Sequence, residues 1–320
     1  MTDFTELVDL AAQQLGGTVL AANDEFFAPK ERMLTPTPAE WREGVYDERG
    51  KWMDGWETRR RREPGYDWAI VHLGVRGIVR GVVIDTSWFR GNYPDRASIE
   101  GCDVAGTPSA GELSGWRELL PESPLAGDSM NKFVVTDGAP VTHLRLNIFP
   151  DGGVARLRVH GEVVASLEAG GLIDLAALEN GGYSVVCSDM FFGHRQNLLM
   201  PGRSTHMGNG WETKRRRGPG HDWTIIRLAR PASVERIELD TDHYKGNAPG
   251  SCMIESCFLP DASADALVNA ATTWTQIVPQ AILQPHARHQ FTPSPLAPAT
   301  HVRLNIYPDG GVARLRLFGR

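Results

Sequence analysis

The sequence HLRLNIFPDGGVARLRVHG at residues 143–161 returns almost unchanged as HVRLNIYPDGGVARLRLFG at residues 301–319. In the second copy Val302, Leu304 and Ile306 alternate with polar residues, and this period of two is typical of a strand with one buried face. The Asp-Gly-Gly that follows supplies turn residues that tolerate positive φ. The block therefore predicts a strand, a tight turn and a second strand, formed twice.

Further blocks recur in the same order along the chain. GWETRRRREPGYDW at residues 55–68 matches GWETKRRRGPGHDW at residues 210–223, and DTSWFRGNYP at residues 85–94 matches DTDHYKGNAP at residues 240–249. Self-similarity that spans a whole chain is the signature of a repeated structural unit. A chain of 320 residues also has the length of two ordinary domains. The sequence therefore predicts two tandem copies of one domain.

We place these two domains at residues 1–161 and 172–320. Short alternating segments separated by turn residues fill both copies, and the chain holds 34 Gly and 21 Pro. Strands at such spacing are typical of a sandwich or jelly roll. The first copy also carries a polar, Pro-containing insertion at residues 35–51, which we expect to be a loop. The predicted fold class is all-β, with two tandem jelly-roll β-sandwich domains.

Helical patterns are confined to the start of each copy, at residues 3–15 and 172–179. In the first of these, Asp3 is a suitable N-cap, and Gly16 with Gly17 is a suitable stop. We expect both segments to be minor helices at the periphery of the sandwiches.

Composition excludes several classes of function. The net charge of −6 argues against general nucleic-acid binding. No stretch has the roughly 18 apolar residues of a membrane helix, and the N-terminus is acidic, so we expect a soluble cytoplasmic protein. The four cysteines form no CxxC pair, and we expect reduced thiols, with Cys102 and Cys257 buried at matching strand positions. No phosphate-binding loop, dinucleotide fingerprint or HExxH sequence occurs.

The two copies have diverged unevenly, since the GWET and PDGGVARLR blocks barely differ while the sequence between them has changed. Two explanations stay open. One is structural, because Trp56 and Trp211 are large packing anchors and the glycines serve turns. The other is a functional site, because packing alone gives no reason to retain charged residues such as Glu57, Asp151 and Arg156.

The arginine runs at residues 59–62 and 214–217 lie between a Trp-Glu-Thr and a Gly-x-Asp-Trp. On a strand, alternate arginines point opposite ways, so one pair can enter a cleft while the other is solvated. A guanidinium holds a carboxylate through two parallel hydrogen bonds, which suits recognition of a small anion. The competing interpretation is ion pairing with Glu57 and Asp67 inside the domain.

Histidine is distributed unequally between the copies. His221 stands where the first copy has Tyr66, and His243 stands where it has Trp88. Each lies near an aspartate, so acid-base chemistry or metal binding can use these imidazoles. The alternative is that they are ordinary surface or hydrogen-bonding residues.

With these blocks in view, the chain resembles the allantoicase family over essentially its full length. The resemblance rests on DEFF, GWETRRRR, GYDW or GHDW, DTxxF/YxGNxP and PDGGVARLR in duplicate, and on DMFFGHRQNLLMPGR in the second copy. It implies jelly-roll domains similar to galactose-binding modules and a homo-oligomer. It further implies an enzyme of purine and allantoin degradation, a hydrolase of C–N bonds in linear amidines that converts allantoate to (S)-ureidoglycolate and urea.

Two other functions compete with this one. A non-catalytic β-sandwich module that binds a small sugar or carboxylic acid is the main rival, because fold does not determine function. A structural assembly protein would instead place the retained polar row in a subunit interface.

Allantoate carries a carboxylate and two ureido groups on one carbon, so its site needs guanidinium and amide partners, an acid and a base. The candidate catalytic residues are Glu212, His221, Asp222 and His243. The candidate substrate-binding residues are Arg215, Arg217, Asn247, Arg303, Asn305 and Arg314. Their first-copy counterparts are Glu57, Arg60, Arg62, Asp67, Asn92, Arg145, Asn147 and Arg156. A divalent metal such as manganese stays open, because no ligand spacing is diagnostic.

Overall fold

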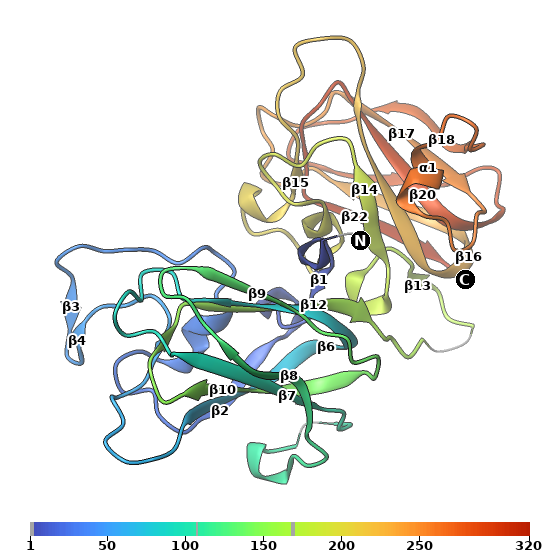
Figure 1. Cartoon of the computed structure of the whole chain (residues 1–320). Helices are drawn as coiled ribbons and strands as arrows, with labels where there is room; N and C mark the ends of the chain where they lie inside the picture. The colour runs from blue at the N-terminus through green and yellow to red at the C-terminus, as the bar shows by residue number, and fades with distance from the viewer. Residues whose placement is uncertain (1–2, 107, 168–169) are drawn as a thin grey trace. The chain divides into compact units, whose positions relative to one another are not determined.

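The computed structural model describes residues 3–106, 108–167 and 170–320, and it divides the chain into two compact units, Met1–Ala165 and Ser166–Arg320 (Figure 1). Each unit is built around an eight-stranded antiparallel sheet. The prediction of two tandem all-β domains is therefore confirmed, while the boundaries at residues 161 and 172 stay predictions.

The sheet of the first unit runs in the order β1-β12-β6-β10-β7-β8, with β2 and β9 also paired to β6. In chain order its strands are β1 (Val8–Asp9), β2 (Thr18–Ala22), β6 (Asp67–Asp85), β7 (Arg96–Cys102), β8 (Arg117–Pro124), β9 (Met130–Val134), β10 (Val141–Phe149) and β12 (Arg156–Val163). The 19-residue β6 belongs to both layers of the sandwich. Its first part pairs with β2 and β10, and its last part pairs with β9 and β12. One strand that changes partners in this way links the two layers.

The second unit repeats this topology, in the order β13-β22-β16-β20-β17-β18, with β14 and β19 paired to β16. Its strands are β13 (Ile173–Asp174), β14 (Tyr183–Cys187), β16 (Asp222–Asp240), β17 (Ser251–Cys257), β18 (Thr275–Ile282), β19 (Arg288–Phe291), β20 (Pro298–Tyr307) and β22 (Arg314–Gly319). Small two-stranded sheets complete the units, namely β3 (Tyr46–Asp47) with β4 (Gly50–Lys51), β5 (Trp56–Glu57) with β11 (Gly153–Val154), and β15 (Trp211–Glu212) with β21 (Gly311–Val312).

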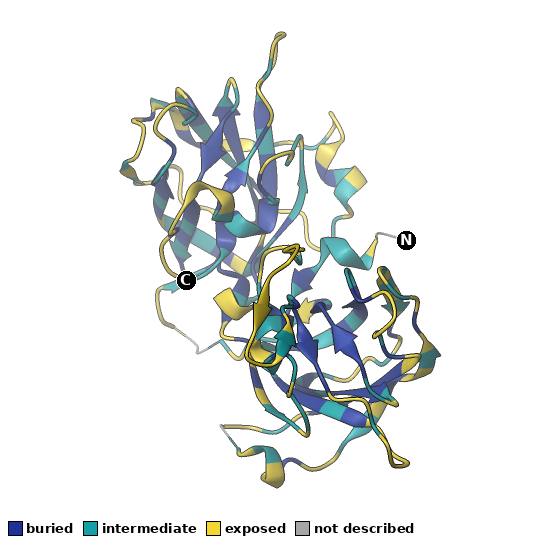
Figure 2. Ribbon diagram, turned by 90° about the vertical axis from the view of Figure 1, so that its left-hand side faces the viewer, coloured by how far each residue is buried: buried dark blue, intermediate teal, exposed yellow. Residues whose placement is uncertain are grey.

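The core of each unit lies between its two layers, where the buried residues concentrate in the strands (Figure 2). Val302, Leu304 and Ile306 are fully buried, as their alternation predicted. Their polar neighbours are less exposed than one solvated face would leave them, because His301 and Asn305 are both 2% exposed. The Asn305 amide can be buried because its Nδ2 donates a hydrogen bond to Glu255 Oε2, on the neighbouring strand β17, at 2.8 Å.

The predicted helix at residues 3–15 is wrong, although its cap and its stop are right. The segment forms two 3-10 turns, η1 (Phe4–Glu6) and η2 (Gln13–Leu15), with strand β1 between them. Asp3 caps η1, and Gly16 ends η2 in the left-handed conformation at φ 100°. Pairing of β1 with β12 outcompetes the helical pattern, because strand pairing also buries Leu10 and Ala11 completely.

The second predicted helix, at residues 172–179, is wrong for the same reason, because β13 pairs with β22 and only the turn η5 (Leu178–Asn180) follows. The remaining 3-10 turns are η3 (Lys30–Leu34), η4 (Ala110–Glu112), η6 (Arg195–Leu199) and η7 (Met207–Asn209). The one α-helix in the described residues, α1 (Ala264–Val268), was not predicted.

Two smaller predictions concern the cysteines and the membrane. Cys102 and Cys257 are unpaired and buried at the ends of β7 and β17, as their matching positions predicted. Among the described residues, no helix has the length and apolar character needed to cross a membrane.

Replacement of Gly153 by alanine tests how closely the turn of the PDGG block is packed. An added Cβ would lie 2.0 Å from the ring of Phe89, which is fully buried. We expect Gly153→Ala to lower the free energy of unfolding by about 2 kcal/mol through overpacking. Gly138→Ala is the matched control, since among the described residues none but its chain neighbours has an atom within 4 Å of its added Cβ, and it should change stability by less than about 0.5 kcal/mol. Equal urea midpoints for the two variants would contradict this packing.

Candidate active site

Three of the repeated blocks meet at one end of the first unit. Strand β5, from the GWET block, pairs with β11 of the PDGG block, so that Glu57 lies opposite Gly153. Gly153 N donates to Asn92 O at 2.7 Å, which joins the GNYP block to the same point. Thr58 closes the arrangement, because its backbone N donates to Gly152 O at 3.1 Å.

Part of the similarity between the copies therefore has a structural cause. Gly152 has φ 139°, and an added Cβ would lie 2.7 Å from Pro94 N. In the second unit an added Cβ at Gly310 would lie 2.5 Å from Asn247 O. Glycine is needed at both places because backbone packs directly against backbone. Trp56 and Trp211 are fully buried, as expected for packing anchors.

The meeting point of these blocks borders a hollow of 590 Å³, which we call the Glu57 hollow. It is lined by Phe27, Glu57, Thr58, Arg60, Arg61, Arg62, Gly91, Asn92, Tyr93, Asp95, Pro150, Asp151 and Gly152. Charged and amide side chains dominate one part of this lining, and three ring-bearing residues supply an apolar part. Such a mixture suits a small polar molecule.

Glu57 is the buried acid of this hollow, with 9% of its surface exposed. Its Oε1 accepts a hydrogen bond from Asn92 Nδ2 at 2.7 Å. Burial raises the pKa of the Glu57 carboxyl above its ordinary value, and the Asn92 hydrogen bond offsets part of that rise. A carboxyl group with a raised pKa in a polar hollow is a candidate proton donor.

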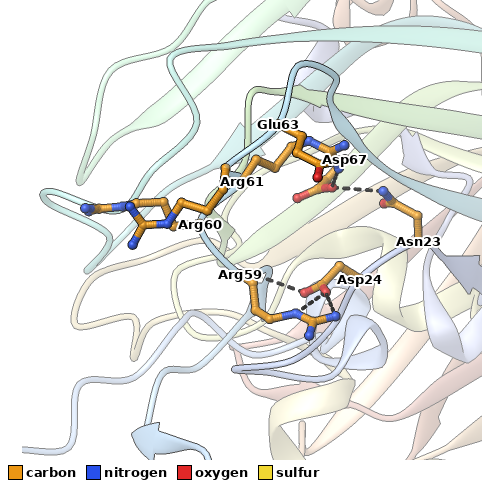
Figure 3. A pocket seen from close by; sticks show the side chains of 8 residues that line it. Asn23, Asp24, Arg59, Arg60, Arg61, Glu63 and Asp67 are labelled. Atoms are coloured by element: carbon orange, nitrogen blue, oxygen red, sulfur yellow. Dashed lines mark hydrogen bonds and ion pairs between the residues drawn. The ribbon is translucent and has the colours of Figure 1, made fainter.

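The arginine run divides into two pairs, as the alternation predicted, although residues 59–62 form no strand. Arg59 Nε donates to Asp24 Oδ2 at 2.7 Å, and Arg61 Nη1 donates to Asp67 Oδ1 at 2.7 Å (Figure 3). Arg60 and Arg62 are exposed and form no ion pair among the described residues. These two guanidinium groups are therefore available to an anion in the hollow.

The competing prediction, ion pairing inside the domain, is right for Asp67 and wrong for Glu57. Asp67 is 1% exposed and also accepts a hydrogen bond from Asn23 Nδ2 at 2.8 Å (Figure 3). Glu57 bonds to an amide instead of a guanidinium. The buried aspartate thus braces the arginine run, while the buried glutamate has no cationic partner in the part of the chain that the structure describes.

The second unit repeats this arrangement with small changes. Arg216 pairs with the buried Asp222, Asn247 Nδ2 donates to Glu212 Oε1 at 2.5 Å, and Lys214 pairs with Asp189 at 3.4 Å. The two remaining arginines, Arg215 and Arg217, are exposed.

Arg145 and Asn147 form a separate network on β10, outside the lining of the Glu57 hollow. Arg145 Nε donates to Glu100 Oε2 at 2.7 Å, and its guanidinium lies 4.9 Å from the centre of the Trp116 ring. Asn147 Nδ2 donates to the same Glu100 oxygen at 3.0 Å. The counterparts Arg303, Asn305, Glu255 and Trp274 repeat the network in the second unit.

Arg156 and Arg314 hold loops in place. Arg156 is 2% exposed, and its guanidinium donates to Thr37 O at 2.8 Å, to Pro38 O at 3.3 Å and to Asp54 Oδ2 at 2.6 Å. Arg314 is 4% exposed and donates to the carbonyl oxygens of Asn197, Gly202 and Asn209. Because their donors meet backbone carbonyls, we assign neither arginine to substrate.

Both candidate histidines also have protein partners. His221 Nε2 lies 3.0 Å from Asn305 Oδ1, and its ring packs on Tyr307 with a centroid distance of 4.5 Å. His243 Nε2 lies 3.0 Å from Ser204 O, much as Trp88 Nε1 donates to Ala39 O at 3.0 Å in the first unit. These contacts match the hydrogen-bonding alternative.

A divalent metal such as manganese, which the sequence left open, stays a prediction. The described residues contain no group of three or more His, Cys, Asp or Glu side chains placed to hold an ion.

Phe27 lines the Glu57 hollow but was not among the site residues that the sequence predicted. A signal was present, because the Phe-Phe pair at residues 26–27 returns at residues 191–192. Two adjacent aromatic residues are more often core than site, and only the structure places Phe27 at the hollow.

The fold and the hollow define a tandem β-sandwich protein with a polar site suited to a small anion. The model of the allantoicase repeat matches residues 8–164 and 173–320. The chain belongs to the allantoicase family.

The relatives agree over the full length. A probable allantoicase of Pseudomonas paraeruginosa (strain DSM 24068 / PA7) is 50% identical over 323 residues, which cover 99% of this chain and 97% of the relative. A probable allantoicase of Stutzerimonas stutzeri (strain A1501) is 48% identical with the same coverage. The crystal structure of allantoicase from Saccharomyces cerevisiae is 36% identical, with a TM-score of 0.84, over 98% of this chain and 93% of that one.

Removal of the Arg61 side chain tests the buried ion pair. Arg61→Ala leaves the Asp67 carboxylate buried without its cation, so we expect the free energy of unfolding to fall by about 3 kcal/mol. Arg62→Ala removes an exposed arginine that has no ion pair with any described residue, and it should change stability by less than about 0.5 kcal/mol. Urea unfolding of both variants measures the difference, and similar losses would show that the Arg61–Asp67 pair does not brace the run.

Proposed function

We propose that this protein hydrolyses allantoate to (S)-ureidoglycolate and urea, as a hydrolase of C–N bonds in linear amidines. The observation that supports this most directly is the Glu57 hollow, which is lined by a buried acid with a raised pKa and by two arginines that form no ion pair with the residues that the structure describes. The names of the relatives point to the same activity. The homo-oligomer implied by the family and the cytoplasmic location expected from the sequence stay predictions.

Substrate binding is assigned to the charged and amide side chains of the hollow. Arg60 and Arg62 hold the carboxylate of allantoate, because a guanidinium matches a carboxylate in shape and charge. Asn92 and Asp151 lie on the same lining and offer hydrogen-bonding partners to the ureido groups. The substrate then lies with its central carbon toward Glu57.

The reaction is assigned to Glu57 acting first as an acid and then as a base. The protonated carboxyl donates its proton to the nitrogen of the departing ureido group, while the C–N bond breaks and its electron pair stays on that nitrogen. The lone pair of the other ureido nitrogen forms a C=N bond to the central carbon. Water then attacks this carbon, the C=N pair returns to nitrogen, and the Glu57 carboxylate takes a proton from the water. Urea and ureidoglycolate result, with Glu57 protonated again.

The second unit holds the counterpart residues Glu212, Asn247, Arg215 and Arg217. They form a second copy of the proposed site. Asp222, His221 and His243, which the sequence also indicated, have the structural contacts described above, and we assign the proton transfers to the glutamates.

The competing function is binding without catalysis. A urea release assay on allantoate separates the two, because only an enzyme produces urea with time. Release of ammonia in place of urea would indicate hydrolysis at the ureido carbonyl, and would contradict the proposed bond cleavage.

Glu57→Gln tests the proton donor. Because burial raises the pKa of Glu57, its protonated, active form persists to higher pH than for an exposed glutamate, and kcat/KM should fall as pH rises through this pKa. The variant cannot donate the proton, so when Glu212→Gln is the parent background, which removes the second site, urea release should drop about a hundredfold and that descending limb of the pH profile should disappear. Glu212→Gln is the matched variant in the second unit. The urea release rates of the two single variants, each compared with the parent protein, give the share of turnover that each unit contributes. An unchanged pH profile in Glu57→Gln would remove Glu57 from this role.

Arg60→Ala tests carboxylate binding. Loss of one guanidinium from the hollow should raise KM for allantoate about tenfold or more, because a charge-assisted hydrogen-bond pair is lost. Arg59→Ala is the adjacent control, since Arg59 pairs with Asp24 and lies outside the lining of the Glu57 hollow. Steady-state urea release measures both, and an equal rise in KM would contradict the assignment.

A further inference from the structure

Phe27 and its counterpart in the second unit, Phe192, differ in their surroundings. Phe27 is partly buried, and it lines both the Glu57 hollow and a smaller hollow of 390 Å³. This second hollow is also lined by Pro29, Arg32, Asp47, Glu48 and Arg49. The counterpart in the second unit, Phe192, is 62% exposed.

The cover over Phe27 comes from the insertion at residues 35–51, which extends beside the first unit with its β3–β4 hairpin (Figure 1). Arg49 Nη1 in this hairpin donates to Glu25 O at 3.2 Å, two residues before Phe27. Gly50 lies close enough that an added Cβ would be 3.9 Å from the Phe27 ring. The hairpin therefore packs against Phe27, which also lines the Glu57 hollow.

The insertion is itself firmly held. Its root is fixed by the buried Arg156, through the carbonyl oxygens of Thr37 and Pro38. Farther along, Trp41 stacks on Trp88 with a centroid distance of 5.8 Å. A segment held at both points can keep a neighbouring ring in one position.

The other contacts of Phe27 are the same in both units and do not explain the difference. Phe27 N donates to Glu57 O at 3.2 Å, and Phe192 N donates to Glu212 O at 3.1 Å. Each ring also meets the preceding phenylalanine edge to face, with centroid distances of 5.1 Å for Phe26–Phe27 and 4.8 Å for Phe191–Phe192. The insertion is the feature that the first unit has and the second lacks.

We infer that Phe27, positioned by the insertion, is a substrate-contacting residue of the Glu57 hollow, and that it makes the first unit the principal site of turnover. This inference rests on the proposed function. A ureido group is flat, with hydrogen-bonding edges and apolar faces, so Asn92 and Asp151 can bind its edges while the Phe27 ring covers one face.

The test compares Phe27→Ala with Phe192→Ala in the full chain. Phe27→Ala should lower kcat/KM for allantoate at least tenfold, while Phe192→Ala should stay within about twofold of the parent protein. Phe27→Tyr keeps the flat ring and should recover most of the activity. Thermal unfolding of each variant separates loss of the ring from loss of the fold.

Arg49→Ala tests the insertion as a positioning element. It should raise KM more than it lowers kcat, and Arg49→Lys, which keeps a donor for Glu25 O, should restore KM. The inference is overturned if folded Phe27→Ala retains half or more of kcat/KM, or if Phe192→Ala loses as much. Absence of urea release by the parent protein would instead refute the proposed function.

Discussion

The close approach of the PDGG turn to the backbone of the GNYP block is the constraint on which the site depends. Gly152 and Gly153 have no Cβ, so the turn packs directly against residues 92–94, and Gly153 N bonds to Asn92 O at 2.7 Å. The same turn pairs with the strand that carries Glu57. One contact between backbones therefore places an acid, an amide and the end of an arginine run around a single hollow. A side chain at either glycine would separate these elements.

Charge is distributed around this hollow so that each ionisable group has one task. Asp24 and Asp67 neutralise Arg59 and Arg61 and hold the run in shape. Arg60 and Arg62 line the hollow and are exposed. Glu57 accepts a hydrogen bond from the neutral Asn92 amide. Burial raises the pKa of Glu57, and among the described residues no cation forms an ion pair with Glu57 that would lower this pKa again. An anion-binding surface and a proton donor can thus coexist within a small volume.

The two units share this design and differ in what surrounds it. His221 replaces Tyr66 and hydrogen bonds to Asn305, and His243 replaces Trp88 and takes over a bond to a loop carbonyl. These substitutions preserve the sandwich. The insertion in the first unit changes the environment of the hollow itself, because its hairpin packs against Phe27, which lines the hollow. Divergence after duplication has therefore altered the wall of one site more than its charged groups.

The sequence by itself determined the duplicated sandwich, because strand alternation and turn glycines act locally and appear directly in rows such as Val302, Leu304 and Ile306. It also indicated the division of the arginine run, since alternate side chains point opposite ways wherever a chain is extended. Only the tertiary structure decided that residues 3–15 form a paired strand and turns, that Arg156 clamps a loop, and that Phe27 borders a hollow. These outcomes depend on contacts between residues far apart in the chain, and no local pattern records which distant partner will occupy a side chain.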